Sequence, residues 1–307
     1  MSAIKSPLTK TDNIKLVREI AVSQLIEQWK NSFNIDISRE MKGHKYISEY
    51  QCNVTGLYFF MPENVDGSGE FYEALQHFDW YYMPEKWEHQ ITLKKLKPTS
   101  KILEVGCAEG GFIEVCTKHG HDATGIELNR NAVLKATKKG LPVYEKNLHE
   151  LANEEESSYD CVCSFQVLEH ISGPKEFIDS CIKLLKPGGK LIFCVPNSHG
   201  VLATDYSLLD MPPHHMTRWN KSSFKSLETF FPIKLNSVYY EPLAKYHWDW
   251  YLSLVRNKKI PYKVLRKIFS ASVANKVYKS VFSLGCNKFI KGHTIYVEFI
   301  KHKEPVS

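Results

Sequence analysis

Residues Ile102–Phe112 read ILEVGCAEGGF, an apolar run that leads into a glycine-rich turn. Together with Lys101, the apolar run has the length of a short buried strand. Gly106 and Gly110 would let the backbone turn tightly and approach a ligand closely. The helix expected after the turn would offer its unpaired backbone N–H groups to that ligand. The stretch therefore predicts a strand, a ligand-binding turn and a helix in succession.

The same alternation of strand and helix continues from this turn almost to the end of the chain. Further strands are expected at residues 122–128, 141–147, 159–165, 190–197, 233–241 and 292–301. Helices are expected at residues 110–120, 129–140, 174–186 and 221–230. Pro187, Gly188 and Gly189 are expected to stop the third of these helices. Strands that alternate with helices of this length favour an α/β fold with a doubly wound, mostly parallel sheet of seven strands.

The first third of the chain has a different pattern. Residues 1–45 are expected to be helical, because apolar residues recur there at spacings of three and four. These residues are Ile14, Val17, Ile20, Ala21 and Leu25. A hairpin with its turn at NVTG is expected at residues 46–62, and helices are expected in the aromatic-rich residues 71–96.

Two domains follow from this change of pattern. Residues 1–97 are expected to form an N-terminal helical and aromatic-rich extension that acts partly as a lid. Residues 98–307 are expected to form the α/β domain, with a basic helical insertion at about 243–291 before the last strand.

Composition is typical of a globular protein, with 43% hydrophobic and 24% charged residues among 307. The first twenty residues contain no apolar run that suits a signal peptide, and no later stretch is apolar over the length of a membrane span. We therefore expect a cytoplasmic protein. The eight cysteines are dispersed, and several lie in apolar runs such as YDCVCSF, so no disulfide framework is expected.

Positive charge is concentrated at the carboxyl end of the chain. Residues 251–307 hold 12 Lys or Arg against two acids, which gives +10, whereas the whole chain carries +6. Such asymmetry can mark a contact with an anionic membrane surface or with phosphate, here through residues 251–291. A solvated helical face is the alternative interpretation, and the sequence leaves both open.

A second signal identifies the ligand as a compound that contains adenosine. Glu127 ends the second strand, 21 residues after Gly106, which is the spacing at which an acid accepts hydrogen bonds from ribose hydroxyls. The run from Gly106 reads GCAEGG and fails the G-x-G-x-x-G template of dinucleotide-binding turns. Glu104 would repel a pyrophosphate, whereas its carboxylate suits the ammonium group of a methionine moiety.

At these residues the sequence resembles the class I S-adenosylmethionine-dependent methyltransferases. The first motif of that family, E-x-G-x-G-x-G, is matched by Glu104, Gly106 and Gly110, with Ala108 where glycine is usual. Alanine fits this position if its φ is negative. The resemblance continues through YDCVCSFQVLEHI (159–171) and LLKPGGKLIFCVPN (184–197).

The resemblance implies S-adenosylmethionine as the cofactor. Glu127 matches the acid that binds the ribose in that family, and Asn147 with Leu148 stands where the family contacts the adenine. Gln166 and His170 could line the site, although His170 could equally be a packed residue and Glu169 could simply support the local turn. The expected cofactor-binding residues are Glu104, Gly106, Cys107, Ala108, Gly110, Glu127, Leu128, Asn147, Leu148, Phe165, Gln166 and His170.

The acceptor side of the site is expected in DMPPHHMTRW (210–219), which follows the fifth strand. His214 and His215 are the predicted catalytic residues, as a base or as substrate contacts, and Arg218 is a further substrate contact. Hydrogen bonds that anchor the loop are the alternative role of the two histidines. A similar stretch in methyltransferases of natural-product and glycan clusters, and the related architecture of quinone-biosynthesis O-methyltransferases, imply a small-molecule or carbohydrate-type acceptor.

No metal site is expected. Adjacent side chains on an extended chain point to opposite sides, so His214 and His215 should not share an ion, and only one of them should face the substrate. The zinc-binding Cys pair of some relatives is broken here, because Thr55 stands where a second cysteine would follow Cys52.

Aromatic residues before the glycine turn could close over the cofactor. Tyr72, Tyr81, Tyr82 and Trp87 are the candidates, and Tyr82 with Trp87 is the pair chosen as lid residues. The alternative, favoured for most of the four, is a core between the N-terminal region and the sheet.

The sequence thus predicts a methyltransferase that transfers a methyl group to a small-molecule or sugar-linked acceptor, at oxygen. The first alternative is a nucleic-acid-modifying methyltransferase. Against it, the fourth strand ends in CSFQ (163–166) and lacks the N/D-P-P-Y/F motif by which many enzymes of that class hold a flipped base. The second alternative is a non-catalytic domain that retains the cofactor site.

Overall fold

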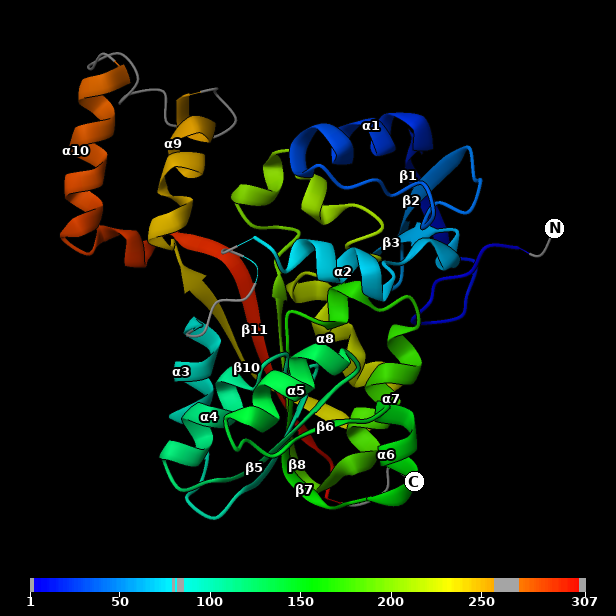
Figure 1. Cartoon of the computed structure of the whole chain (residues 1–307), viewed down its shortest axis with the longest axis vertical. Coiled ribbons are helices and arrows are strands. Elements are labelled where there is room, and N and C mark those ends of the chain that lie inside the picture. The colour runs from blue at the N-terminus through cyan, green and yellow to red at the C-terminus, as the bar shows by residue number, and fades with distance from the viewer. Residues whose placement is uncertain (1–2, 79–80, 82–85, 257–270, 304–307) are drawn as a thin grey trace.

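A seven-stranded sheet forms the centre of the larger part of the molecule (Figure 1). The computed structural model describes residues 3–78, 81, 86–256 and 271–303. The strands are β4 (Lys101–Val105), β5 (Asp122–Glu127), β6 (Val143–Glu145), β7 (Tyr159–Phe165), β8 (Leu185–Pro196), β10 (Ile233–Pro242) and β11 (Lys291–Lys301). Their order is β10-β11-β8-β7-β4-β5-β6. Pairing is parallel from β8 to β6, and β11 is antiparallel to both of its neighbours. The predicted fold class is confirmed.

Helices cover both faces of this sheet. They are α4 (Gly111–Lys118), α5 (Arg130–Lys138), α6 (Leu148–Glu154), α7 (Pro174–Leu184) and α8 (Lys221–Phe230). In β7 every residue but Asp160 is buried, and its side chains alternate between two apolar clusters. Val162 packs in the cluster that includes Phe177 of α7, whereas Cys161 and Cys163 pack in the cluster that includes Phe112 of α4. A strand buried on both faces explains why its sequence is continuously apolar.

A second sheet of four antiparallel strands lies beside the large one at the upper right of Figure 1. It contains β1 (Ile14–Ala21), β2 (Tyr46–Cys52), β3 (Tyr58–Met61) and β9 (Thr217–Arg218), in that order. The predicted hairpin is confirmed as β2 and β3. The last strand, β9, comes from the stretch that follows the two histidines, so the chain returns from the large sheet to complete the small one.

The expectation of a helical segment over residues 1–45 is confirmed only for residues 22–33 and is wrong for the other described residues of this segment. Residues 14–21 form β1, which pairs with β2 from Ile14↔Cys52 to Ala21↔Tyr46, and only α1 (Val22–Phe33) is an α-helix. The apolar spacing there is compatible with both structures. Pairing with the neighbouring strand decides between them, because it satisfies the backbone groups of both strands.

Two other features of the large sheet differ from expectation. Helix α7 ends at Leu184, before Pro187, and β8 begins at Leu185. Two residues of β7, Tyr159 and Cys161, pair with Leu185 and Lys190, so the Pro-Gly-Gly run is an irregular stretch inside the strand and not the helix stop. Helix α6 was not expected at all.

Short helices complete the fold. Helices α2 (Gly69–Leu75) and α3 (Trp87–Leu93) lie in the aromatic-rich segment, as predicted. The predicted insertion contains α9 (Trp248–Arg256) and α10 (Ala271–Ser283), which stand side by side in Figure 1. The single-turn helices are η1 (Glu63–Val65), η2 (Leu168–His170), η3 (Leu202–Thr204), η4 (Leu208–Asp210), η5 (Lys245–His247) and η7 (Cys286–Phe289). Residues 257–270 of the basic region lie outside the described residues. Within the described residues, no helix has the length and apolar character needed to cross a membrane.

Candidate active site

A cavity of about 1300 Å³ opens at the carboxyl ends of the parallel strands. Its walls include the turn after β4, the end of β5 and the end of β7, together with residues of α2 and of the η4 region. Ligands of doubly wound folds bind at this edge of the sheet. The volume exceeds that of a usual site for one small ligand, so a cofactor and an acceptor fit together.

The glycine turn has the backbone conformation that only glycine adopts without strain. Gly106 has φ of +73°, and a Cβ atom there would lie 2.5 Å from Cγ2 of Val167. Gly110 has φ of +78° and precedes α4. Ala108 does not meet the condition of a negative φ under which alanine fits this position, because its φ is +47°. Ala108 therefore occupies the left-handed region, at a cost of roughly 1–2 kcal/mol.

Three backbone N–H groups orient the carboxylate of Glu127. Its Oε2 accepts a hydrogen bond from the Ala108 N–H at 2.9 Å, and its Oε1 accepts from the Leu128 and Asn129 N–H groups, each at 2.8 Å. The carboxylate lines the cavity. Oε1 accepts two hydrogen bonds and Oε2 accepts one, so Oε2 retains acceptor capacity and Glu127 can also accept a hydrogen bond from a ribose hydroxyl.

Glu104 is buried beneath this region, with 4% of its surface exposed, and does not line the cavity. Burial raises the pKa of Glu104 to about 8, although the positive charge of Lys86 opposes this shift. Its Oε2 has no hydrogen-bond partner within the described part of the chain. A buried carboxyl oxygen without a partner is a group that a nearby ligand cation would satisfy.

The remaining predicted cofactor residues divide into two groups. Cys107 and Gly110, like Glu104, do not line the cavity, and Cys107 packs in the core. The structure brings nine others together on the cavity wall: Gly106, Ala108, Glu127, Leu128, Asn147, Leu148, Phe165, Gln166 and His170. The Asn147 side chain also caps α6 by accepting a hydrogen bond from the His149 N–H at 2.8 Å.

Three histidine rings meet in the wall of the same cavity. His170 comes from η2, and His214 and His215 come from the turn after η4. The ring centroids lie 4.7 Å apart for His170–His214, 4.9 Å for His170–His215 and 4.4 Å for His214–His215. All three residues line the cavity, and one ring nitrogen of each lies within 4.8 Å of one ring nitrogen of the other two.

The expectation that His214 and His215 point to opposite sides is therefore wrong. Their rings stack with an interplanar angle of 20°. The chain is not extended here: the backbone N–H groups of both residues donate to the Met211 carbonyl, at 3.0 and 3.1 Å. A turn places successive side chains on one side, and both rings consequently face the cavity.

The hydrogen bonds of the three rings determine which nitrogen carries the proton. Nδ1 of His170 lies 2.5 Å from the His214 carbonyl oxygen, and Nδ1 of His214 lies 2.7 Å from the Leu209 carbonyl oxygen. Nδ1 of His215 lies 3.4 Å from Oδ1 of Asp210. Carbonyl and carboxylate oxygens only accept, so each Nδ1 is the donor and each Nε2 holds a lone pair in the neutral ring.

Burial keeps two of these rings neutral. It lowers the pKa of His170 to about 3, with a further contribution from the charge of His215. Burial, and then the neighbouring histidines, hold the pKa of His214 well below its usual value. Nε2 of His214 has no hydrogen-bond partner among the residues that the structure describes. A neutral ring with an unpaired nitrogen is an acceptor for a ligand proton or a cation.

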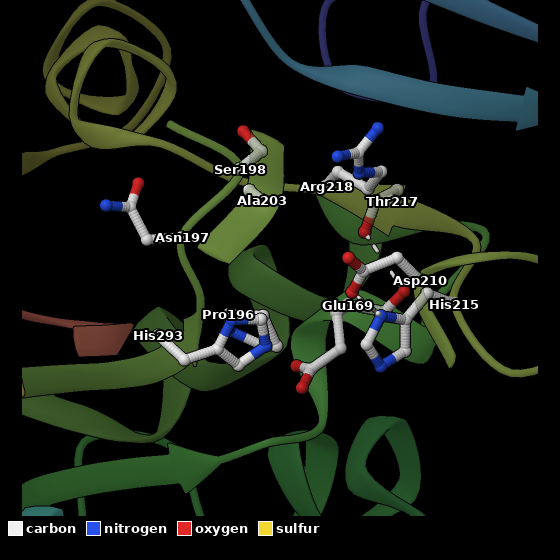
Figure 2. Close-up of a pocket in the computed structure, with 10 residues that line it drawn as sticks. All are labelled: Glu169, Pro196, Asn197, Ser198, Ala203, Asp210, His215, Thr217, Arg218 and His293. Atoms are coloured by element: carbon white, nitrogen blue, oxygen red, sulfur yellow. Dashed lines mark hydrogen bonds and ion pairs between the residues drawn. The ribbon is translucent and has the colours of Figure 1, made fainter. Parts of the chain in front are cut away.

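A smaller cavity adjoins the cluster and holds its acidic partners (Figure 2). Figure 2 shows Glu169, Asp210 and His215 close together, with His293 across the pocket. The volume of about 10 Å³ leaves room for about one water molecule. Burial alone would raise the pKa of Asp210, but the hydrogen bond and charge of His215 outweigh it and lower the value to about 2. Burial raises the pKa of Glu169 to about 8.

Arg218 and the aromatic residues differ in their placement. Arg218 lines the smaller cavity and not the larger one, and its Nη1 donates to Oε1 of Glu49 on β2 at 2.8 Å. Trp87 lines the large cavity, as do Tyr72 and Tyr81. Tyr82 lies outside the described residues.

Sequence reasoning gave no site role to two residues beside the histidines. The sequence suggests only support for a turn at Glu169 and no role for Asp210. One signal could have found Asp210, because an acid four residues before a histidine pair can hold an imidazole in one tautomer.

Comparisons with known proteins agree with this geometry. A family model described as "Methyltransferase domain" matches residues 79–266, which is more than half of the chain. The chain belongs to this family. With its doubly wound sheet and the glycine turn that leads to Glu127, it is a class I S-adenosylmethionine-dependent methyltransferase, and hence an enzyme.

Two curated relatives are similar to this chain, each at 26% identity. The "Ubiquinone biosynthesis O-methyltransferase" of Coxiella burnetii is 26% identical over 179 residues, which cover 51% of this chain and 72% of that protein. The protein of the same name from Psychrobacter arcticus is 26% identical over 247 residues, which cover 73% of this chain and 93% of that protein. A solved S-adenosylmethionine-dependent methyltransferase from Archaeoglobus fulgidus has a TM-score of 0.48 at 17% identity, covering 76% of this chain and 95% of that chain.

Proposed function

We propose that this methyltransferase transfers a methyl group to an oxygen atom of a small-molecule or sugar-linked acceptor. One observation carries the proposal: a single cavity is lined both by Glu127, at the end of β5, and by the rings of His170, His214 and His215. Glu127 suits the ribose of a cofactor, and the histidine rings suit a hydroxyl group that must be aligned and must lose a proton.

S-adenosylmethionine is the proposed cofactor, and the residues present fit it. Glu127 would bind the ribose hydroxyls, and the backbone of Gly106 and Ala108 would face the methionine part. Asn147 and Leu148 would contact the adenine, because both line the cavity beyond Glu127. When bound, the cofactor supplies an electrophilic methyl group, so the protein chiefly orients the acceptor.

His214 and His215 remain the proposed catalytic residues, and the structure supplies a third ring, His170. A hydroxyl group that donates to a free Nε2 would have its own lone pair directed elsewhere, toward the methyl group. Because burial keeps His170 and His214 neutral, their Nε2 atoms are available as acceptors at physiological pH.

The acceptor is proposed to be small and to carry a ring. Aromatic side chains line the same cavity, among them Tyr72, Trp87 and Trp250, and the ring of Tyr72 contacts that of His170. Flat apolar walls suit an aromatic ring, and they suit the face of a sugar as well. The names of the curated relatives support oxygen as the methylated atom, since those proteins are called O-methyltransferases.

Three broader expectations remain proposals. Residues 1–97 would act as a partial lid over the domain formed by residues 98–307. The basic residues 251–291 would contact an anionic surface or phosphate; Leu284 and Phe289 there are 85% and 90% exposed. The cytoplasm is the proposed compartment, since all eight cysteines are free thiols, which suits a reducing environment.

The test is transfer of a labelled methyl group from S-adenosylmethionine to a panel of hydroxylated aromatics and glycosides. We expect a labelled methyl ether with at least one of them, and a much lower rate for His214→Gln and His215→Gln. Two results would overturn the proposal: label found only on nitrogen or carbon, or label that enters RNA or DNA but none of the small molecules. The second result would favour the nucleic-acid-modifying alternative.

A further inference from the structure

The three histidines share an arrangement that the methyl transfer alone does not require. In each ring Nδ1 faces an oxygen atom: the His214 carbonyl, the Leu209 carbonyl and the Asp210 carboxylate. These contacts use Nδ1, and Nε2 of His214 has no hydrogen-bond partner among the described residues. Metal-binding histidines in proteins are held in this way, with the second nitrogen donating to a carbonyl or a carboxylate.

We propose that His170, His214 and His215 bind one divalent transition-metal ion, with zinc as the ion that fits best. One nitrogen from each ring already lies within 4.8 Å of the others. Nitrogens bound to one tetrahedral zinc at about 2.0–2.1 Å lie about 3.3 Å apart. Ring rotations that move each nitrogen by on the order of an ångström would therefore place the three nitrogens at the distances needed to bind one ion. Three imidazoles favour zinc or a similar transition metal over magnesium or calcium, which prefer oxygen ligands.

A carboxylate stands next to the cluster. Oε1 of Glu169 lies 4.0 Å from Nε2 of His170, and Oε2 of Glu169 has no hydrogen-bond partner within the described ranges. Glu169 is 2% exposed, so this oxygen is also cut off from bulk water. Glu169 is thus placed either to complete the coordination or to hold a ligand of the ion.

The same observations argue against the alternative that the three histidines only pack in the core and bind nothing. Trp29 and Phe71 pack against the ring of His214, so the rings do contribute to the core. Packing, however, leaves Nε2 of His214 and Oε2 of Glu169 buried without partners among the described residues, which is unfavourable for both atoms. A cation bound by the rings would be a partner for Nε2 of His214, and a ligand of that ion would be a partner for Oε2 of Glu169.

An ion at this position would meet the acceptor. All three histidines and Glu169 line the large cavity, so one coordination position can remain open to a ligand from that side. The role of the ion in binding the acceptor hydroxyl rests on the proposed function, but the existence of the site does not. The ion would then contact the hydroxyl in place of the free ring nitrogens.

The test is titration of the chelator-treated full chain with zinc, followed by calorimetry, and with cobalt, followed by absorption spectroscopy. The variants are His170→Gln and His214→Gln, with His119→Gln as the matched control. His119 is an exposed histidine on another part of the molecule. Thermal melting of each variant checks that it is folded.

We expect one zinc per chain, with at least a tenfold loss of affinity in both cluster variants and no change in the control. No zinc binding by the wild type, or equal binding in all variants, would overturn the proposal. If the cluster variants do not fold, the cobalt spectrum of the wild type decides. Bands of nitrogen-ligated cobalt alone support the site, whereas thiolate charge-transfer bands would place the ion on cysteine and refute it.

Failure of this inference can be told apart from failure of the proposed function. Full-rate methyl transfer by the chelator-treated enzyme would refute the role of the ion and leave oxygen methylation standing. Absence of transfer to every hydroxylated acceptor, with and without zinc, would count against the proposed function, and the zinc titration would still decide whether the site exists.

Discussion

The imidazole rings of His214 and His215 stack with their centroids 4.4 Å apart and their planes inclined by 20°. Both rings therefore face the cavity, although the residues are adjacent in sequence. Each is fixed through Nδ1, His214 by the Leu209 carbonyl and His215 by the Asp210 carboxylate. In the proposed function the pair acts as one surface toward the acceptor, which leads to the first prediction.

Replacing either histidine by glutamine should lower kcat by about 100-fold, the scale expected when a reacting group loses its alignment. The dissociation constant for S-adenosylmethionine should stay within about twofold of the wild type, since the proposed cofactor contacts, Glu127 and the glycine turn, are unchanged. Steady-state kinetics with a competent acceptor, together with calorimetry of cofactor binding, measures both quantities. Equal losses in cofactor affinity and in kcat would point to a general loss of structure.

The glycine turn provides a matched pair of substitutions. Gly106 and Gly120 both have positive φ, +73° and +76°, but only at Gly106 would a Cβ meet an obstacle, namely Val167 at 2.5 Å. Gly120→Ala should cost roughly 1–2 kcal/mol from backbone strain alone. Gly106→Ala should cost more and should be partly rescued by Val167→Ala. Urea unfolding of the four proteins measures these costs, and equal costs for the two glycines would contradict the close contact.

Ala108 should be a site where glycine is better. Because its φ is +47°, the change Ala108→Gly should raise the free energy of unfolding by about 1 kcal/mol. In the control Ala132→Gly, on helix α5, the same change should lower it by about 1 kcal/mol or more. Opposite signs in the two proteins are the expected result, and a loss at both positions would contradict the left-handed conformation.

Glu104 should make the stability of the protein depend on pH. Its pKa is about 8 in the folded state because of burial, against a usual value of 4.5. The folded state consequently holds the proton more tightly than the unfolded state between these values, and stability falls as pH rises through that window. The neutral variant Glu104→Gln lacks this loss.

The measurement is urea unfolding of the wild type and Glu104→Gln at several pH values from 5 to 8. The variant should gain stability relative to the wild type on the order of 1 kcal/mol per pH unit. A constant difference across the range would mean that the carboxyl group titrates normally in the folded protein.

Much of the large sheet could be predicted from sequence because one strong signal repeats. Runs such as YDCVCSF are too apolar to lie anywhere but between two helical layers, and the glycines Gly120 and Gly140 mark the ends of helices α4 and α5. Glu127 could be placed because strand ends in a parallel sheet meet at one edge. These inferences depend only on local pattern and on the geometry of the sheet.

Most of the wrong predictions have one cause: contacts between segments distant in sequence selected one of two local structures that the sequence allows. Strand β1 has apolar spacing that suits a helix, and pairing with β2 selects the strand. Helix α6 did have a signal, because Asn147 caps it and Glu150 stands in its first turn. The backbone turn at Met211 that unites His214 with His215, and the approach of His170 from another loop, had no signal within a single segment.

Glu127 is proposed to anchor S-adenosylmethionine in the same cavity that holds the hydroxyl group of the small-molecule acceptor. The most direct test is cofactor binding by Glu127→Gln, with Glu145→Gln as control, since Glu145 is an exposed acid paired with Glu127 on the next strand. Losing hydrogen bonds to a charged acceptor costs about 1.5–3 kcal/mol. We predict a loss of affinity of at least about tenfold for Glu127→Gln and none for the control. Unchanged affinity in Glu127→Gln, or no binding of S-adenosylmethionine by the wild type, would contradict the claim.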